Sequence, residues 1–272
     1  MIERLHFISG LPRSGSTLLA ALLRQNPRFN AGMTSPLCML TVAMLEQMSP
    51  AKQFSTQFDA ARRRAILRGL FASYYSDAGD AQVVFDTNRV WSGKTALLGE
   101  LYPESRVICC VRDVGAIIDS VEHMLRKNPL QTSRLFNYKP GGSIYSRVQI
   151  LMNTETGLIG LPWSALHEAW HGEDASRLIL VQYDSLARDP RAVLRRLYAE
   201  LGEKPFDHNF DAVEFDQPDY DEELGMPGMH AVRPKVEAQE RARRIPPELI
   251  QRHADLAFWT HPDKNPNRVL VL

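Results

Sequence analysis

The residues best suited to chemistry lie close together near the start of the chain, between Gly10 and Thr17. Gly10 and Gly15 enclose four residues, which is the glycine spacing of a phosphate-binding loop. Glycine lets the backbone approach an anion closely, and the N–H groups of such a turn converge on it. A helix that starts directly after the loop adds a partial positive charge. The segment therefore predicts a site for a phosphate or a similar anion.

The residue that follows Gly15 distinguishes this loop from that of nucleotide triphosphatases. It is Ser16, whereas those enzymes carry a lysine there that binds the β- and γ-phosphates. The cation of the loop is Arg13 instead, and the sequence offers no obvious acidic ligand for Mg²⁺. The loop is thus predicted to bind a phosphate-like group that needs no metal. A P-loop kinase or another nucleotide phosphotransferase, which needs ATP and Mg²⁺, is the alternative.

The elements that must position this loop alternate between strands and helices. Short apolar runs predict strands at 5–9, 82–85, 106–111 and 177–182. Apolar residues at helical spacing, with stop signals such as Asn-Pro, predict helices at 16–24, 34–49, 57–76, 92–101, 114–127, 143–153, 163–171, 190–201 and 246–258. This alternation predicts an α/β, P-loop-type three-layer fold with a central parallel sheet flanked by helices. The length is compatible with a single domain over residues 1–272.

The run ISGLPRSGSTLL at residues 8–19 resembles the 5′-phosphosulfate-binding loop of sulfotransferases that use 3′-phosphoadenosine 5′-phosphosulfate (PAPS). Its PRSGST core is most similar to the protein-tyrosine and related Golgi and bacterial sulfotransferases. The resemblance implies transfer of a sulfuryl group from PAPS to a hydroxyl or amine, leaving adenosine 3′,5′-bisphosphate. It also implies that Arg13 is catalytic and that the cofactor is bound by Pro12, Arg13, Ser14, Gly15, Ser16 and Thr17.

The same resemblance implies a second cofactor anchor. Sulfotransferases hold the 3′-phosphate with an arginine after a strand and a serine eight residues later, and Arg112 and Ser120 have this spacing after the predicted strand 106–111. Ligands of parallel sheets bind at the carboxyl ends of strands, and arginine makes bidentate bonds to phosphate. The alternatives are a structural ion pair for Arg112 and a hydroxyl bonded to its own helix for Ser120.

Two later segments also resemble parts of these enzymes. Tyr183 follows the predicted strand 177–182, as does a tyrosine near the cofactor in the family. His230 and Arg233 lie in a stretch that matches a late loop over the nucleotide. The surrounding residues 203–236 have little periodicity and are predicted to form a loop region that covers cofactor or acceptor. Within them, the acidic stretch 216–223 is interpreted as a solvated loop.

The general base is where the sequence departs from its relatives, because the expected glutamate or histidine is absent from the matching positions. Asp86, placed at the end of the predicted strand 82–85, is the candidate base, and Arg89 is the candidate cation for the leaving oxygen. Burial would raise the pKa of such a carboxylate toward that of a useful base. Alternatively, Asp86 and Arg89 form a structural pair, or the chain is a catalytically silent nucleotide-binding relative.

Composition limits the partners. The 32 basic and 32 acidic residues give zero net charge, which argues against a nucleic-acid binder. The three cysteines have no metal-ligand spacing, and no metal is expected. No apolar stretch reaches the roughly 20 residues of a membrane span, so a cytoplasmic protein is expected. The acceptor is left open between small molecule, peptide and carbohydrate, and a homodimer is compatible with the sequence.

Overall fold

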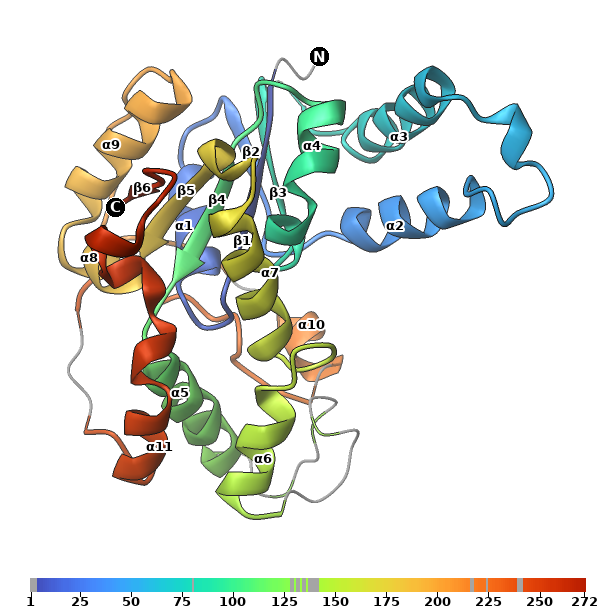
Figure 1. Ribbon diagram of the computed structural model, residues 1–272. Helices are drawn as coiled ribbons and strands as arrows, with labels where there is room; N and C mark the ends of the chain where they lie inside the picture. The colour runs from blue at the N-terminus through green and yellow to red at the C-terminus, as the bar shows by residue number, and fades with distance from the viewer. Residues whose placement is uncertain are drawn as a thin grey trace.

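The structure is a computed structural model (Figure 1). It describes residues 4–79, 81–127, 130, 133, 136, 142–215, 218–223, 225–238 and 242–272. None of the helices formed by these residues is long and apolar enough to cross a membrane.

Within the described residues, six strands form one parallel sheet in the order β2-β3-β1-β4-β5-β6. Their bounds are β1 Arg4–Gly10, β2 Phe29–Ala31, β3 Val83–Thr87, β4 Val107–Val111, β5 Leu178–Gln182 and β6 Leu270–Val271. The central strand β1 pairs with β3 on one side and β4 on the other. Its carboxyl end therefore lies between the carboxyl ends of two neighbours, at the edge of the sheet where α/β proteins bind ligands.

Helices cover both faces of this sheet (Figure 1). Their bounds are α1 Ser16–Leu23, α2 Leu37–Gln47, α3 Ala60–Tyr74, α4 Thr95–Leu101, α5 Val114–Lys127, α6 Ile144–Leu151, α7 Gly160–His171, α8 Tyr183–Arg188, α9 Pro190–Leu201, α10 Pro218–Glu223 and α11 Pro247–Arg252. Apolar residues of α1, α8 and α9 pack on one face, and those of α2, α3, α4, α5 and α7 pack on the other. The α/β fold with a central parallel sheet flanked by helices is thus confirmed.

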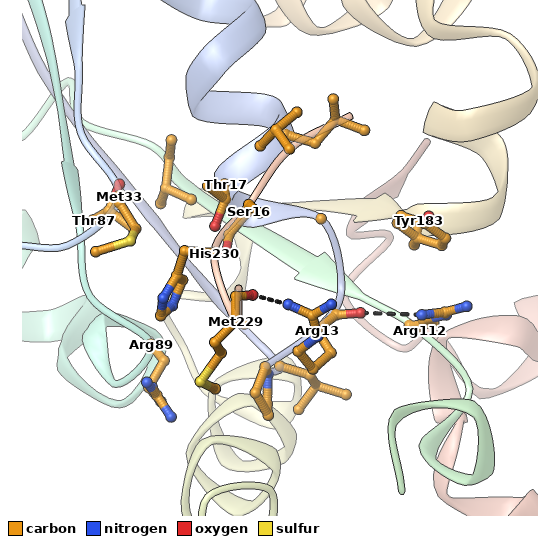
Figure 2. Close-up of a pocket in the computed structure, with 18 of the residues that line it drawn as sticks. Arg13, Ser16, Thr17, Met33, Thr87, Arg89, Arg112, Tyr183, Met229 and His230 are labelled. Carbon is orange, nitrogen blue, oxygen red and sulfur yellow. Dashed lines mark hydrogen bonds between the residues drawn. The ribbon is translucent and has the colours of Figure 1, made fainter. Parts of the chain in front are cut away.

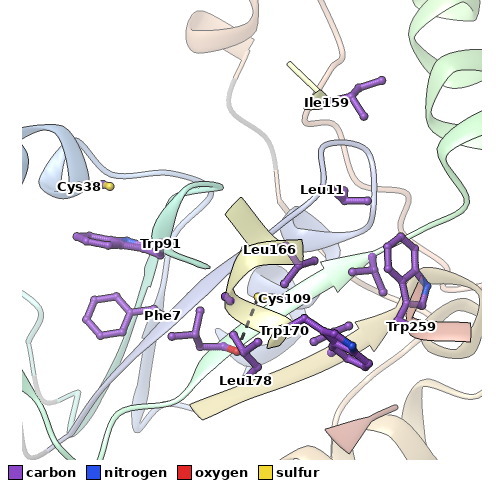
Figure 3. Close-up of a cluster of buried hydrophobic side chains, with 14 of the residues drawn as sticks. Phe7, Leu11, Cys38, Trp91, Cys109, Ile159, Leu166, Trp170, Leu178 and Trp259 are labelled. Carbon is purple, nitrogen blue, oxygen red and sulfur yellow. Dashed lines mark hydrogen bonds between the residues drawn. The ribbon is translucent and has the colours of Figure 1, made fainter. Parts of the chain in front are cut away.

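Alternation along the strands produces these two cores. In β1, Phe7 belongs to the core under α3 and α7, whereas Ile8 belongs to the core under α1. In β4, Cys109 and Cys110 divide in the same way, because successive side chains of a strand point to opposite faces. Figure 3 shows the first core, where Phe7 and Cys109 lie among large side chains such as Trp91 and Trp170. Near-continuous apolar strands are what a sheet buried on both faces requires.

The boundaries differ from the sequence expectation in a few places. Strands β2 and β6 were not predicted, because three and two residues are too few for a periodic signal. The predicted helix 246–258 ends at Arg252 and continues as short 3₁₀ turns. Tyr183 does not simply follow β5 but starts helix α8. Most of the described part of 203–236 is irregular, as expected, apart from α10.

Candidate active site

The loop between β1 and α1 has the backbone of an anion-binding turn. Gly10 has φ 101° and lies so close to β4 that an added Cβ would be 2.2 Å from the carbonyl oxygen of Cys110. Arg13 and Gly15 also have positive φ, 55° and 88°. Gly15, which has no side chain, stands at the N-cap of α1, so the first N–H groups of this helix are left for a ligand. The predicted phosphate loop is present in the structure.

A pocket opens at this loop, at the carboxyl ends of β1, β3 and β4 (Figure 2). Residues of the loop, of the ends of β3 and β4, and of the segment 229–237 line it. The structure brings most of the predicted site residues to this pocket, namely Pro12, Arg13, Gly15, Ser16, Thr17, Arg89, Arg112, Tyr183, His230 and Arg233. Three predicted residues are not part of its lining, namely Ser14, Asp86 and Ser120.

Arg13 is held from several sides. Its Nε donates a hydrogen bond of 3.2 Å to Oγ of Ser120, which is buried in α5. Its Nη1 donates to the carbonyl oxygen of Met229, and its own carbonyl oxygen accepts a 3.4 Å bond from Nη1 of Arg112 (Figure 2). Because of the bond with Nε of Arg13, Ser120 lies next to the loop arginine, behind the pocket wall. Ser14 is also buried, and its hydroxyl donates a 3.2 Å bond to the Pro12 carbonyl oxygen.

Arg112 and Tyr183 form the wall opposite the end of β3. The guanidinium carbon of Arg112 lies 4.3 Å from the centre of the Tyr183 ring, within the range of a cation–π contact. The same ring packs against the loop, because a Cβ added to Gly15 would be 2.9 Å from its Cδ2. The ring of Tyr183 thus contacts both the phosphate loop and Arg112, the predicted second anchor of the cofactor.

Asp86 lies within a strand and not, as expected, directly after its end. Strand β3 continues to Thr87, so Asp86 lies within the strand, and its side chain points to the core on the α3 side, whereas Thr87 lines the pocket. Its carboxylate is fully buried and accepts hydrogen bonds from the Tyr75 hydroxyl at 2.6 Å and from Trp91 Nε1 at 2.5 Å. Burial raises the pKa of Asp86. The carboxylate is thus held in the core and is not part of the pocket lining, and the two bonds described here go to Tyr75 and Trp91 and not to Arg89.

Arg89, in contrast, lines the pocket. Its backbone is fixed, since its carbonyl oxygen accepts a 3.0 Å bond from the Ser9 hydroxyl, and that hydroxyl in turn accepts a 3.0 Å bond from the N–H of Ser92. Burial lowers the pKa of Arg89, yet an arginine keeps its charge near neutrality. Arg89 therefore adds a cation to the pocket, on a backbone that Ser9 holds in place.

The late segment crosses the pocket from the side of α10. It is held by backbone bonds to an upstream stretch, from Val213 N–H to the Pro234 carbonyl at 2.7 Å and from Val236 N–H to the Phe210 carbonyl at 2.8 Å. Arg233 is exposed at the pocket rim, whereas His230 is largely buried. Residues of this late segment thus contribute to the lining of the pocket.

One buried residue of this region was not expected from the sequence. Asp221, in α10, is buried, and its Oδ1 lies 2.5 Å from Nδ1 of His230 while its Oδ2 accepts a 2.8 Å bond from the His230 backbone N–H. The interpretation of 216–223 as a solvated loop is wrong for this residue; residues 216 and 217 lie outside the described part of the chain. Nothing in the sequence marks the pair, because its members are nine positions apart in a stretch without periodicity.

No group of three or more histidine, cysteine, aspartate or glutamate side chains among the described residues is arranged to hold a metal ion. The pocket is lined instead by cationic side chains, namely the four arginines Arg13, Arg89, Arg112 and Arg233, and Lys235. Arginine and loop amides are donors suited to an oxyanion.

Comparisons with known proteins agree with this description. The model of the sulfotransferase family matches residues 6–208. The chain is 26% identical over 230 residues to the nodulation protein NoeE of Sinorhizobium fredii (strain NBRC 101917 / NGR234), covering 76% of this chain and 52% of NoeE. The chain thus spans about half the length of this curated relative.

Two solved structures share the fold. The sulfotransferase domain of the curacin biosynthetic pathway superposes with a TM-score of 0.50 at 19% identity, covering 76% of each chain. The sulfotransferase of Alicyclobacillus acidocaldarius gives a TM-score of 0.51 at 15% identity, covering 82% of this chain and 90% of that one. The family model matches most of the chain, and the phosphate loop lines the pocket. This protein therefore belongs to the sulfotransferase family.

Proposed function

We propose that this chain transfers the sulfuryl group of PAPS to a hydroxyl or amine of an acceptor, without a metal ion, and releases adenosine 3′,5′-bisphosphate. The observation that carries the proposal is the phosphate loop, which presents Arg13 to the pocket and has Ser16 in the position of the nucleotidase lysine. A phosphosulfate carries less charge than a triphosphate, so loop amides and arginines suffice for it.

The donor would extend along the pocket from the loop to Arg112. The loop amides and Arg13 would hold the 5′-phosphosulfate, and Arg112, supported by the Tyr183 ring at 4.3 Å, would bind the 3′-phosphate. Ser120, which is not part of the pocket lining, would support the site through the 3.2 Å bond that its Oγ accepts from Nε of Arg13. Arg233, exposed at the rim, would add charge beside the nucleotide.

In the reaction, the acceptor oxygen or nitrogen attacks sulfur in line with the bond between sulfur and the bridging oxygen. As that bond breaks, its electron pair stays on the 5′-phosphate, where negative charge develops. Arg13 and the N-terminus of α1 stabilise this charge, and Arg89 supplies a further cation from the opposite side of the pocket. Most of the catalytic effect then comes from orientation of the two reactants and from these fixed charges.

The alternative of a P-loop kinase makes a different demand on the site. Transfer of a γ-phosphate needs a metal ion and a lysine near the β- and γ-phosphates, and Ser16 stands in the lysine's position. A catalytically silent relative would keep the arginines but lack a base for the proton of the acceptor. The kinase thus differs from the proposed enzyme in needing a metal ion, and the silent relative differs in having no turnover.

Incubation of the protein with PAPS and a panel of phenols, alcohols and amines, followed by chromatography of the nucleotide, tests the proposal. We expect formation of adenosine 3′,5′-bisphosphate that is insensitive to EDTA. Arg13→Ala should slow it by about 10²–10³-fold, the effect of losing one donor to the charge of the transition state, while Arg188→Ala, which removes an arginine that does not line the pocket, should not. Turnover that occurs only with ATP and Mg²⁺ would establish the kinase instead.

A further inference from the structure

The base that the sequence lacks at the usual positions has a candidate in the late segment that lines the pocket. His230 lines the pocket, and its ring is held by Asp221, a buried carboxylate of α10. Both carboxylate oxygens of Asp221 contact His230. Oδ1 lies 2.5 Å from Nδ1 of the ring, and Oδ2 accepts a 2.8 Å bond from the backbone N–H. The ring position and the backbone position are therefore fixed by the same carboxylate.

This arrangement decides which ring nitrogen carries the proton. An ionised carboxylate only accepts hydrogen bonds, so the hydrogen lies on Nδ1 and points to Asp221. Nε2, on the other side of the ring, then keeps its lone pair. Since Asp221 is buried and the side chain of His230 is 15% exposed, the exposed part of the pair is the imidazole. Figure 2 shows this ring between Thr87 and Arg89, at the end of β3.

The surroundings of the ring favour its neutral form. Burial is the largest effect and lowers the pKa of His230, Asp221 raises it, and Arg13 and Arg89 lower it again; the net direction is down. Tyr220 of α10 also lies beside the ring, and the two ring centres are 5.6 Å apart. A neutral imidazole with a free lone pair is able to accept a proton at neutral pH.

We propose, on the basis of the function proposed above, that His230 is the general base of the sulfuryl transfer and that Asp221 is its positioning residue. As the acceptor oxygen or nitrogen forms its bond to sulfur, its proton passes to Nε2 of His230, while the electron pair of the broken S–O bond remains on the 5′-phosphate. Asp221 stabilises the imidazolium that forms, as in other carboxylate–histidine pairs. The proton is then released to solvent, and the ring returns to its neutral form.

The first test reads the ring directly and needs no acceptor. Two-bond ¹⁵N–¹H correlation spectra of the labelled protein at about pH 7.5, assigned by the signal that His230→Asn removes, distinguish the two tautomers and the charged form. We expect the proton on Nδ1, with and without adenosine 3′,5′-bisphosphate. In Asp221→Asn the amide can donate to Nδ1, so the proton should move to Nε2. A wild-type ring that is charged, or that carries its proton on Nε2, overturns the proposal.

The second test measures sulfuryl transfer from PAPS to phenol and to p-nitrophenol, at a pH at which only p-nitrophenol is ionised. His230→Asn and Asp221→Asn should lower transfer to phenol by about 10²–10⁴-fold, the usual contribution of a general base. Transfer to p-nitrophenol should fall much less, because this acceptor has no proton to lose. His171→Asn, in an exposed position of α7, is the matched control and should behave as wild type.

The outcomes separate this inference from the function on which it rests. If the rates of transfer to phenol and to p-nitrophenol fall equally in the variants, and the variants bind adenosine 3′,5′-bisphosphate more weakly, His230 only holds the late segment in place. The proposal is then wrong. The same holds if they transfer to phenol at the wild-type rate. If the wild-type protein does not bind the bisphosphate at all, the donor is wrong, while the tautomer of His230 can still be read.

Discussion

The guanidinium of Arg112 lies 4.3 Å from the centre of the Tyr183 ring, and the same ring packs against Gly15 of the phosphate loop. A strand end, a loop and a helix start are thus joined by one aromatic side chain. The arrangement keeps the arginine in a fixed direction before any ligand binds, which lowers the entropy lost on binding.

This contact leads to a prediction for nucleotide binding. Tyr183→Leu removes the ring face beneath Arg112 and should weaken the binding of adenosine 3′,5′-bisphosphate by about 1 kcal/mol, within the range of a cation–π contact. Tyr183→Phe keeps the face and should bind nearly as wild type. Isothermal titration calorimetry measures both. Equal losses in the two variants would mean that the hydroxyl, and not the ring, is what matters.

The close approach of the loop to β4 predicts a large cost for a single methyl group. Gly10→Ala places a Cβ 2.2 Å from the carbonyl oxygen of Cys110 and imposes φ 101° on an alanine. We expect the free energy of unfolding to fall by more than about 2 kcal/mol, since both overpacking and backbone strain are introduced.

Gly69→Ala is the matched control for that variant. Gly69 lies in α3, and no atom is within 4 Å of an added Cβ. Here the same substitution should raise stability by about 0.5–1 kcal/mol, the usual difference between glycine and alanine inside a helix. Urea unfolding compares the two proteins, and a tolerated Gly10→Ala would show that the loop backbone is not as closely packed as described.

Asp86 should prove to be a structural residue. In Asp86→Asn one carboxylate oxygen becomes an NH₂ group, so either Tyr75 or Trp91 loses its acceptor. A buried donor without a partner should lower the free energy of unfolding by about 1–3 kcal/mol. The binding of adenosine 3′,5′-bisphosphate should stay the same in the folded protein. A variant that is as stable as wild type but inactive would return Asp86 to the catalytic mechanism.

His6 makes the stability of the protein depend on pH. Its Nδ1 accepts a 3.1 Å bond from the N–H of Arg106, and burial, together with Arg4 and Arg106, lowers its pKa from 6.5 to about 4. Between these two values the unfolded chain binds a proton that the folded chain does not. This residue's contribution to the free energy of unfolding is therefore retained above pH 6.5 and declines as the pH falls toward 4.

The size of that decline can be isolated with one variant. It should approach roughly 3 kcal/mol, since one pH unit of pKa difference corresponds to about 1.4 kcal/mol. In His6→Asn, Oδ1 can accept the Arg106 bond without titrating, so the pH dependence of denaturant unfolding should be reduced by about this amount. If wild type and variant lose stability in parallel from pH 7 to pH 4, His6 is protonated in the folded state.

Much of the fold followed from the sequence because its signals are local. The glycines at 10 and 15 fix the phosphate loop, and apolar runs mark β1, β3, β4 and β5. The prediction failed where it depended on the exact end of a strand. With a strand that ends at Phe85, Asp86 would follow the strand and lie at the site. Strand β3 instead ends at Thr87, and Asp86 within it has its side chain buried in the core.

The rest of the site depends on contacts between distant segments. The pairing of Asp221 with His230 and the position of Tyr183 under Arg112 are set by the packing of irregular or short elements, which have no periodicity to read. Ser120 was found by its spacing from Arg112, yet the partner it has in the structure is Arg13, 107 positions away in the chain. Such a contact cannot be inferred from local sequence patterns.

Calorimetric titration of the protein with adenosine 3′,5′-bisphosphate, ADP and ATP, each with and without Mg²⁺, tests the central claim most directly. If the chain uses PAPS, the bisphosphate should bind well, independently of Mg²⁺, and at least about tenfold more tightly than ADP, because Arg112 has a 3′-phosphate to bind, and a bond to a charged group contributes roughly 1.5–3 kcal/mol. Preferential binding of ATP in the presence of Mg²⁺, with no gain from the 3′-phosphate, would contradict the account.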